Sequence, residues 1–221
     1  MPEEFLLNDL SGIILSRKPL GDRKLLLDIF VKDYGIFSVF VRVGTSGRSH
    51  FGGDIEPFNW CKFVLKKSSK SRIYTVQDVE NYDDMLLVKL RPKALKLVLQ
   101  WVIDIKKYLI QEQPDNFLLE NLYDNMLLLK IEHIPVEIVN FRFKWNWLDL
   151  WGIAPEFEKF FDLKKFTLNE IKLLQFVVTF DRKKLSELFS NIQNQNPSYL
   201  EHVKKICIQA VRLTQEFFIE K

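Results

Sequence analysis

The residues best suited to chemistry are basic side chains in three turns of the first third of the chain, in the segments "SRKPLGDRK" (16–24), "VRVGTSGRS" (41–49) and "VLKKSSKSR" (64–72). Residues 11–75 hold twelve Lys or Arg and five Asp or Glu, a net charge of +7, whereas the whole chain has a net charge of +3. Aromatic rings beside positive charge are the combination that holds single-stranded nucleic acid. The aromatic residues that interleave with these bases are Phe40, Phe51, Phe58, Trp60 and Tyr74. The candidate DNA-binding residues are Arg17, Lys18, Arg23, Lys24, Arg42, Arg48, Lys62, Lys66, Lys67, Lys70 and Arg72.

Each candidate also has a simpler interpretation, because a lysine in a turn is usually solvated and an aromatic residue in a strand usually lies in the core. The glycine-containing segment "GTSGRS" (44–49) is not a phosphate loop, since no Lys followed by Ser or Thr comes after its second glycine. It also precedes an expected strand, so no helix N-terminus is available to receive an anion. We interpret it as a basic link between two strands, with Arg48 as a phosphate contact.

The sequence contains no catalytic or metal-binding pattern. His50, His133 and His202 are isolated from one another, and the two cysteines, Cys61 and Cys207, are far apart. Such cysteine usage argues against a disulfide framework or a structural zinc site and fits a reducing compartment. We therefore expect a protein that is not an enzyme and that uses no cofactor and no metal.

The N-terminus has no secretory signal pattern. No segment approaches the roughly 18 uncharged apolar residues that a membrane span needs. We expect a cytoplasmic protein without a membrane partner.

The positions of the basic turns follow from short apolar segments that alternate with turn residues, a pattern typical of an all-β barrel or sandwich. In residues 36–43, Phe37, Val39, Val41 and Val43 share one face, which is the period of a strand. Gly52 and Gly53 are expected to adopt backbone angles closed to other residues. The expected strands are residues 11–18, 25–32, 36–43, 57–66 and 72–79, with "KDYG" (32–35) and "KSSKS" (67–71) as turns.

After about residue 82 the apolar residues recur every three to four positions, which predicts helices. Prolines precede several of these segments, at a position where a missing N–H is tolerated. The expected helices are residues 92–111, 115–131, 136–151, 168–179, 182–191 and 197–219. We predict an α+β protein with an all-β domain at residues 1–81, a five-stranded OB-fold barrel, followed by an all-α helical bundle domain at residues 82–221.

Residues 11–58 resemble the N-terminal domain of RecO, a bacterial recombination mediator. That family has a strand of the type G-x-V/I-L, a polar turn ending near Gly-Glu/Asp, a strand leading to F-x-x-x-x-G, and a basic loop that runs to S-R/H-F-G-G-x-L/I-x-P-F. The segment "FRFKWNWLDLWGIAPEF" (141–157) is weakly similar to a later helix of the family that ends in Gly-x-x-Pro. The matching positions are Gly12, Ile13, Gly21, Asp22, Phe30, Gly35, Arg42, Ser49, Phe51, Gly52, Gly53, Pro57 and Phe58, then Gly152 and Pro155.

The chain departs from the family in one respect. Many members follow the Gly-x-x-Pro with paired cysteines that hold zinc, whereas residues 156–166 contain none. We expect no zinc here, and a hydrophobic turn around Phe157, Phe160 and Phe161 in its place.

The resemblance implies a recombination mediator in DNA repair that binds single- and double-stranded DNA and anneals complementary strands. It further implies that the protein works with RecR to load RecA onto DNA coated by single-strand binding protein, in the cytoplasm and at the nucleoid. The family also docks the acidic tail of single-strand binding protein on its helical domain. Candidates to receive that tail are Arg91, Lys93, Lys96, Arg142, Lys144, Lys204, Lys205 and Arg212.

Two other classes remain open from the sequence. One is a non-enzymatic adaptor whose barrel binds a partner protein rather than DNA. The other is an enzyme whose site forms on folding, which a pocket joining His50, His133 or acidic residues would favour.

Overall fold

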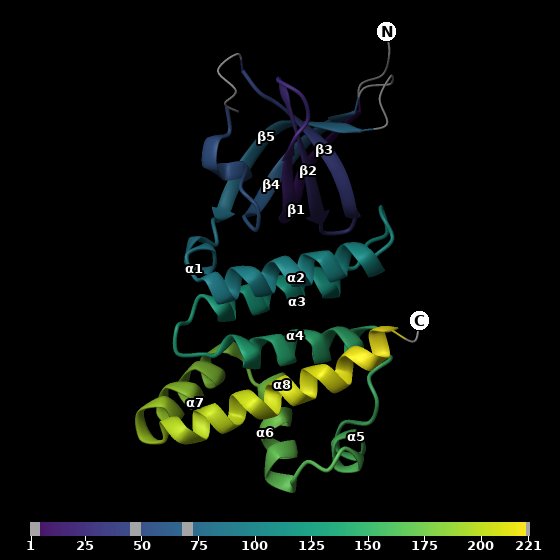
Figure 1. Cartoon of the computed structure of the whole chain (residues 1–221). Coiled ribbons are helices and arrows are strands. Elements are labelled where there is room, and N and C mark those ends of the chain that lie inside the picture. Colours follow the sequence, from purple (N-terminus) through teal and green to yellow (C-terminus); the bar gives the residue numbers. More distant parts are fainter. Residues whose placement is uncertain (1–4, 45–49, 68–72, 220–221) are drawn as a thin grey trace. The chain divides into compact units, whose positions relative to one another are not determined.

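The first part of the chain is a five-stranded barrel. The computed structural model of the protein describes residues 5–44, 50–67 and 73–219 (Figure 1). The strands run in the order β1-β2-β3-β5-β4 around a closed barrel, in which β4 pairs with β1 and the one parallel pair of strands is β3 with β5. This arrangement confirms the predicted OB-type barrel. The strands are β1 (Phe5–Pro19), β2 (Lys24–Val31), β3 (Gly35–Arg42), β4 (Trp60–Lys67) and β5 (Tyr74–Asp83), with a short 3-10 helix (Gly52–Ile55) before β4.

Alternation along β3 decides which residues fill the barrel, as the sequence predicted. Phe37, Val39 and Val41 are buried in the core, whereas Phe40 is half-buried and Arg42 is exposed on the opposite face. The turn at residues 32–35 joins β2 to β3, with Val31 paired to Gly35. The expected turn at residues 67–71 lies almost entirely outside the described residues.

The segment before β4 differs from the prediction, because β4 begins at Trp60 rather than at residue 57. Asn59 is buried and its amide donates to the carbonyl oxygens of Gly53 and Asp54, both at 3.0 Å. These bonds hold the 3-10 helix against the strand. Gly52 has a φ of +50°, as expected of a glycine, whereas Gly53 is not among the positive-φ residues.

The chain folds into two compact units, Met1–Leu86 with Val98–Glu120, and Leu87–Leu97 with Asn121–Lys221. The first unit therefore contains helical residues besides the barrel. The boundary that the sequence places between residues 81 and 82 falls within β5, which ends at Asp83, before the first helix begins at Leu86. As a domain boundary it stays a prediction.

Within the first unit, the helical residues are fixed to the barrel through a carboxylate on β2. Asp28 accepts hydrogen bonds from the hydroxyls of Ser16 on β1 (2.7 Å) and Ser38 on β3 (2.6 Å), and it forms a close ion pair with Lys106 on α2. Burial alone would raise the pKa of Asp28, but the hydrogen bonds from Lys106, Ser38 and Ser16 outweigh it and lower that pKa. Asp28 is therefore ionised in the folded protein at neutral pH.

The β2–β3 turn is fixed by a second contact in the same unit. The backbone N–H of Glu112 donates to the carbonyl of Ile36 at 2.9 Å. Gly35 has a φ of +83°, and a Cβ on it would lie 2.3 Å from the carbonyl oxygen of Gln113. Only glycine fits this position without displacing the backbone.

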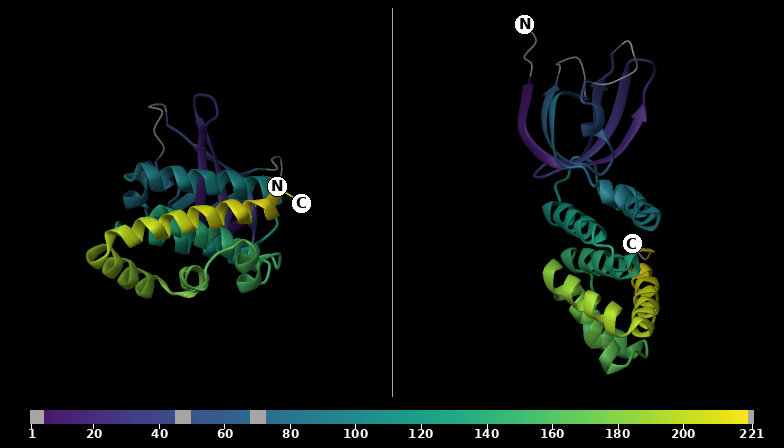
Figure 2. Two further views of the ribbon diagram at one scale, coloured as in Figure 1. Left: turned by 60° about the horizontal axis from the view of Figure 1, so that its bottom comes forward. Right: turned by 90° about the vertical axis from the view of Figure 1, so that its left-hand side faces the viewer.

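The remainder of the chain is helical, and α8 packs along α4 (Figure 2). Each expected helix is present, and prolines begin α2 and α8. The short helices α1 and α5 were not expected, because four and seven residues are too few to show a helical period. The helices are α1 (Leu86–Lys89), α2 (Pro92–Tyr108), α3 (Asn116–Leu129), α4 (Val136–Leu150), α5 (Phe157–Leu163), α6 (Leu168–Thr179), α7 (Arg182–Gln195) and α8 (Pro197–Ile219).

An aromatic cluster anchors α5 in the segment where we expected a hydrophobic turn. The ring of Trp145 lies 4.6 Å from that of Phe157 and 5.3 Å from that of Phe161, and Phe160 lies 4.9 Å from Phe161. The expected hydrophobic cluster is present, but Phe157, Phe160 and Phe161 lie in the helix α5 rather than in a turn.

We predict that Gly35→Ala lowers the free energy of unfolding by about 3 kcal/mol, because it combines positive-φ strain with a backbone overlap. Gly21→Ala is the matched control, since Gly21 has a φ of +67° but no atom lies within 4 Å of the place that a Cβ would take. It should cost only about 1 kcal/mol. Urea denaturation measures both, and equal losses would contradict the role of the Gln113 contact.

We also predict that Asp28→Asn lowers the free energy of unfolding by about 1 kcal/mol at pH 7. The folded-state pKa of Asp28 lies below its ordinary value of 3.8. Its carboxylate therefore contributes stability that is present above pH 3.8 and lost as pH falls through the folded-state pKa. The difference between wild type and variant should stay constant from about pH 7 to 5 and shrink below about pH 3.8. A difference that is independent of pH in urea titrations would show that the charge is not responsible.

Candidate nucleic-acid interface

The outer face of the barrel carries a row of neighbouring side chains with bases on both sides of an aromatic ring. Lys18 on β1 lies opposite Leu26, Leu26 opposite Phe40, Phe40 opposite Thr75, and Thr75 opposite Lys66 on β4. Directly opposite residues have their Cβ atoms about 5 Å apart. The register therefore brings Lys18 and Lys66, which are distant in the sequence, onto one face with Phe40 between them.

A second pair of bases lies beside this row. Lys24 and Arg42 are opposite each other at the ends of β2 and β3, and both are exposed. Like charges that face each other across two strands are unfavourable, and an anion bound between them would relieve that repulsion. The ammonium group of Lys24 lies 5.3 Å from the ring centre of Phe40, so the aromatic ring and the charge are in contact.

The predicted bases fall into two groups: some already form an ion pair with an acidic residue, and others do not. Arg17 forms a close ion pair with Glu56, and Lys62 pairs with Asp9 at 2.6 Å. The hydrogen bond and charge of Asp9 raise the pKa of Lys62. By contrast, the described residues provide no ion pair to Lys18, Arg23, Lys24 or Arg42, all of which are exposed.

Two further bases, Lys66 and Lys67, end β4, and the ammonium group of Lys67 lies 4.9 Å from the ring centre of Tyr74. Arg48, Lys70 and Arg72 lie outside the described residues. Among the described residues, the predicted basic surface extends over β1, β2, β3 and β4.

The aromatic residues do not all lie on this face. Phe58 is buried, and Tyr74 packs against the barrel core 5.7 Å from Phe37. Phe51 also packs against the core. Phe40 is the predicted aromatic residue whose register places it among the exposed bases.

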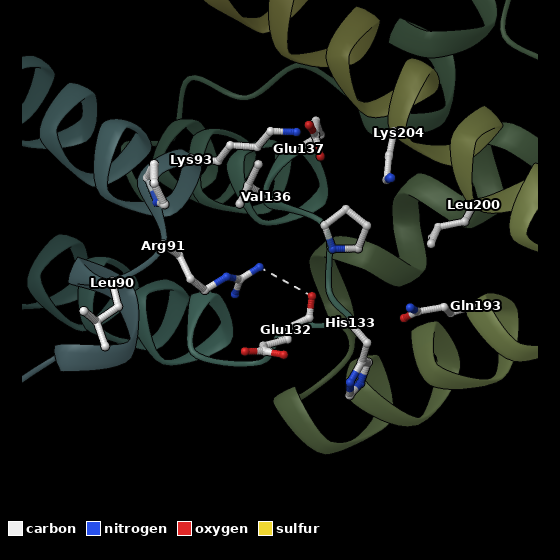
Figure 3. Close-up of a pocket in the computed structure, with 12 residues that line it drawn as sticks. Leu90, Arg91, Lys93, Glu132, His133, Val136, Glu137, Gln193, Leu200 and Lys204 are labelled. Carbon is white, nitrogen blue, oxygen red and sulfur yellow. Dashed lines mark hydrogen bonds between the residues drawn. The ribbon is translucent and has the colours of Figure 1, made fainter.

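The helical unit contains a cavity of about 430 Å³ that brings together several candidates for tail binding. Lys93 on α2 and Lys204 on α8 approach it from opposite sides (Figure 3). The ammonium group of Lys204 also forms an ion pair with Glu201. Leu200 and Val136 add apolar surface. The side chain of Arg91 also lines the cavity, but its guanidinium group donates to the backbone carbonyls of Leu129, Ile131 and Glu132.

The other tail candidates have different surroundings. Arg142 donates to the carbonyls of Val177 (2.7 Å) and Val178 (2.9 Å), and burial lowers its pKa despite the nearby Asp124 and Asp181. Lys144 is only 4% exposed, and its ammonium group lies within 5.2 Å of the ring centres of Trp147 and Phe218. These positions make both residues part of the helix packing. Lys96, Lys205 and Arg212 are exposed on α2 and α8.

The cavity also joins His133 to Glu132 and Glu137, the observation that would favour an enzyme. The Nε2 atom of His133 is already hydrogen-bonded to the carbonyl oxygen and hydroxyl of Ser186, at 2.9 and 3.0 Å. The described residues that line the cavity include no Ser, Thr, Cys or Tyr. The arrangement thus lacks a hydroxyl or thiol nucleophile among them.

His50 is exposed, and Nε2 of His202 lies 3.4 Å from Glu170. Across residues 5–44, 50–67 and 73–219, no three His, Cys, Asp or Glu side chains gather as metal ligands. The expectation that the protein binds no zinc stays a prediction. Cys61 and Cys207 are buried, and Cys61 belongs to the barrel core, as a small packing residue would.

The longest helix in the described part of the chain is α8, which has 23 residues and carries charged side chains along its length. No helix among these residues is both long enough and apolar enough to cross a bilayer.

Comparison with known proteins gives two findings, and both concern the barrel. The family described as "Recombination protein O N terminal" matches residues 7–84. DNA repair protein RecO of Vibrio parahaemolyticus serotype O3:K6 (strain RIMD 2210633) is 31% identical over 67 residues, which cover 30% of this chain and 27% of that relative. The match thus spans about a quarter of the relative's length. The resemblance seen in the sequence is confirmed for the barrel, since residues 7–84 match the model of that N-terminal domain.

Proposed function

We propose that this protein is a recombination mediator in DNA repair that binds single- and double-stranded DNA on the outer face of its barrel. The observation that carries the proposal is the placement of Lys18, Lys24, Arg42 and Lys66 around Phe40. Strands β2 and β3 and the loops beside them are the surface with which OB-folds bind oligonucleotides. The RecO family match to the same residues supports this assignment.

The proposed activity needs no chemistry by the protein. Exposed bases such as Lys24 and Arg42 bind phosphates and release counterions, which lowers the repulsion between two complementary strands and favours their annealing. A base can stack on Phe40 without selecting a sequence, because every base has a π-face. The protein therefore acts as a binding and annealing factor, not as an enzyme, and it uses no cofactor.

We further propose the partners that the family resemblance implies: RecR, single-strand binding protein and, through them, RecA. The acidic tail of single-strand binding protein would dock in the cavity lined by Lys93, Lys204, Val136 and Leu200, beside apolar surface. It would pair with Lys93 and replace Glu201 as the partner of Lys204. The protein would then work at the nucleoid in the cytoplasm.

We predict that Lys24→Ala with Arg42→Ala weakens binding of a single-stranded oligonucleotide and reduces its salt dependence. Each phosphate contact contributes a slope of about −0.7 to log K against log salt for single strands. Losing two contacts should therefore make the slope less steep by about 1.4. At about 0.1 M salt this corresponds to roughly 25-fold weaker binding. Fluorescence anisotropy over a salt series measures both quantities.

Lys159→Ala with Lys172→Ala removes the same charge from exposed positions on α5 and α6 and is the control. It should leave the affinity and the slope near those of wild type. If wild type fails to bind the oligonucleotide at low salt, the barrel is instead an adaptor for a partner protein.

Annealing on DNA coated by single-strand binding protein tests the full proposal. The Lys24→Ala, Arg42→Ala variant should anneal more slowly than wild type on both bare and coated strands. Lys93→Ala with Lys204→Ala should slow annealing on coated strands alone, because only that reaction needs the tail. Fluorescence energy transfer between labelled strands gives the rates.

Lys96→Ala with Lys205→Ala is the matched control, because these lysines are exposed on the same two helices but do not line the cavity. It should anneal as wild type does. If the Lys24→Ala, Arg42→Ala variant anneals both bare and coated strands at the wild-type rate, the barrel face does not take part in annealing.

A further inference from the structure

The barrel unit contains a cavity of about 200 Å³ at the turn between β2 and β3, away from the basic end of these strands. Leu7, Phe37 and Tyr74, which pack in or against the barrel core, form its apolar wall. Asp33, Tyr34 and Glu112 complete the lining. The mouth of a β-barrel is a frequent place for a binding site.

The lining combines aromatic rings with carboxylates. The rings of Phe37 and Tyr74 are 5.7 Å apart, and Tyr34 is 41% exposed beside the turn. Aromatic faces attract cations through the ring quadrupole, and carboxylates add charge-assisted hydrogen bonds. The chemistry of this cavity therefore suits a positively charged group.

The two carboxylates have no cation of the described chain bound to them. Asp33 accepts a hydrogen bond from the amide of Asn116 at 2.6 Å, and neither Asp33 nor Glu112 has an ion pair among the described residues. One ring of the wall already attracts a cation, since the ammonium group of Lys67 lies 4.9 Å from the centre of Tyr74. The cavity thus offers two negative charges that no described ion pair compensates, next to a ring that accepts positive charge.

We propose that this cavity binds an arginine side chain of a partner protein. A guanidinium group is planar, stacks on aromatic rings and donates to carboxylates in a fixed fork, so it uses both kinds of lining. A nucleic acid fits less well, because Asp33 and Glu112 repel phosphate. The basic pair Lys24 and Arg42 is at the opposite end of the same two strands, about 23 Å away along an extended strand. The barrel would therefore hold DNA at one end of these strands and a protein at the other.

The test uses the full chain, labelled with ¹⁵N, and the probe N-acetyl-arginine amide. Its matched control is N-acetyl-citrulline amide, which has the same shape and no charge, at equal ionic strength. We expect the arginine probe to shift the backbone amide signals of Asp33, Tyr34 and Glu112 with a dissociation constant of the order of millimolar. The citrulline probe should leave these signals in place.

Glu112→Gln should weaken binding of the arginine probe about fivefold, through loss of a charge-assisted contact. Glu187→Gln, at an exposed position on α7, should leave it unchanged. Equal shifts with arginine and citrulline, an unaffected Glu112→Gln variant, or no shift with the arginine probe would each overturn the proposal. Shifts of the same signals with a short oligonucleotide in place of the arginine probe would assign the cavity to nucleic acid and overturn it as well. A failure of DNA binding at Lys24 and Arg42 leaves this test unaffected, because the two sites share no residue.

Discussion

The organisation of the barrel unit depends on one largely buried carboxylate. Asp28 receives hydroxyl hydrogen bonds from β1 and β3 and an ion pair from α2, so it joins three strands and a helix at one point on the outer face. Phe30 and Ile36, which point to the same face by alternation, are buried. Leu26 and Phe40, on the other side of Asp28 along their strands, are only half-buried. The buried part of the outer face thus begins at Asp28 and includes Phe30 and Ile36. The part that includes Leu26 and Phe40 is open to a ligand.

Ion pairing then decides which of the many bases on the barrel can act on a ligand. Arg17 and Lys62 pair with Glu56 and Asp9, and an anion would have to displace these acids. Lys24 and Arg42 instead face each other across two strands. A surface charge that repels its neighbour gains more from a bound phosphate than one that is already compensated. The net charge of +7 in residues 11–75 therefore overstates the number of bases available to DNA.

The helical unit uses several of its positive side chains for its own packing. Arg91 and Arg142 donate to backbone carbonyls at helix ends, and Lys144 lies against aromatic rings. Carbonyls at a helix C-terminus have no intrahelical partner, so a guanidinium group there supplies hydrogen bonds and complements the helix dipole. The lysines at the cavity, Lys93 and Lys204, reach their position from helices far apart in the sequence.

Local patterns in the sequence were enough to predict the barrel and the six longer helices, and to indicate the family that the barrel resembles. Alternation located the core face of β3, periodicity located the six longer helices, and the glycine and aromatic positions of residues 11–58 indicated RecO. These features depend on neighbours in the chain, so local spacing encodes them. Only the tertiary structure decided which bases are paired, that Lys18 and Lys66 flank Phe40, and that Asp33, Glu112 and Tyr74 line one cavity. The reason is physical: ion pairs and cavities form between residues that strand register and helix packing bring together, and no local spacing encodes those distances.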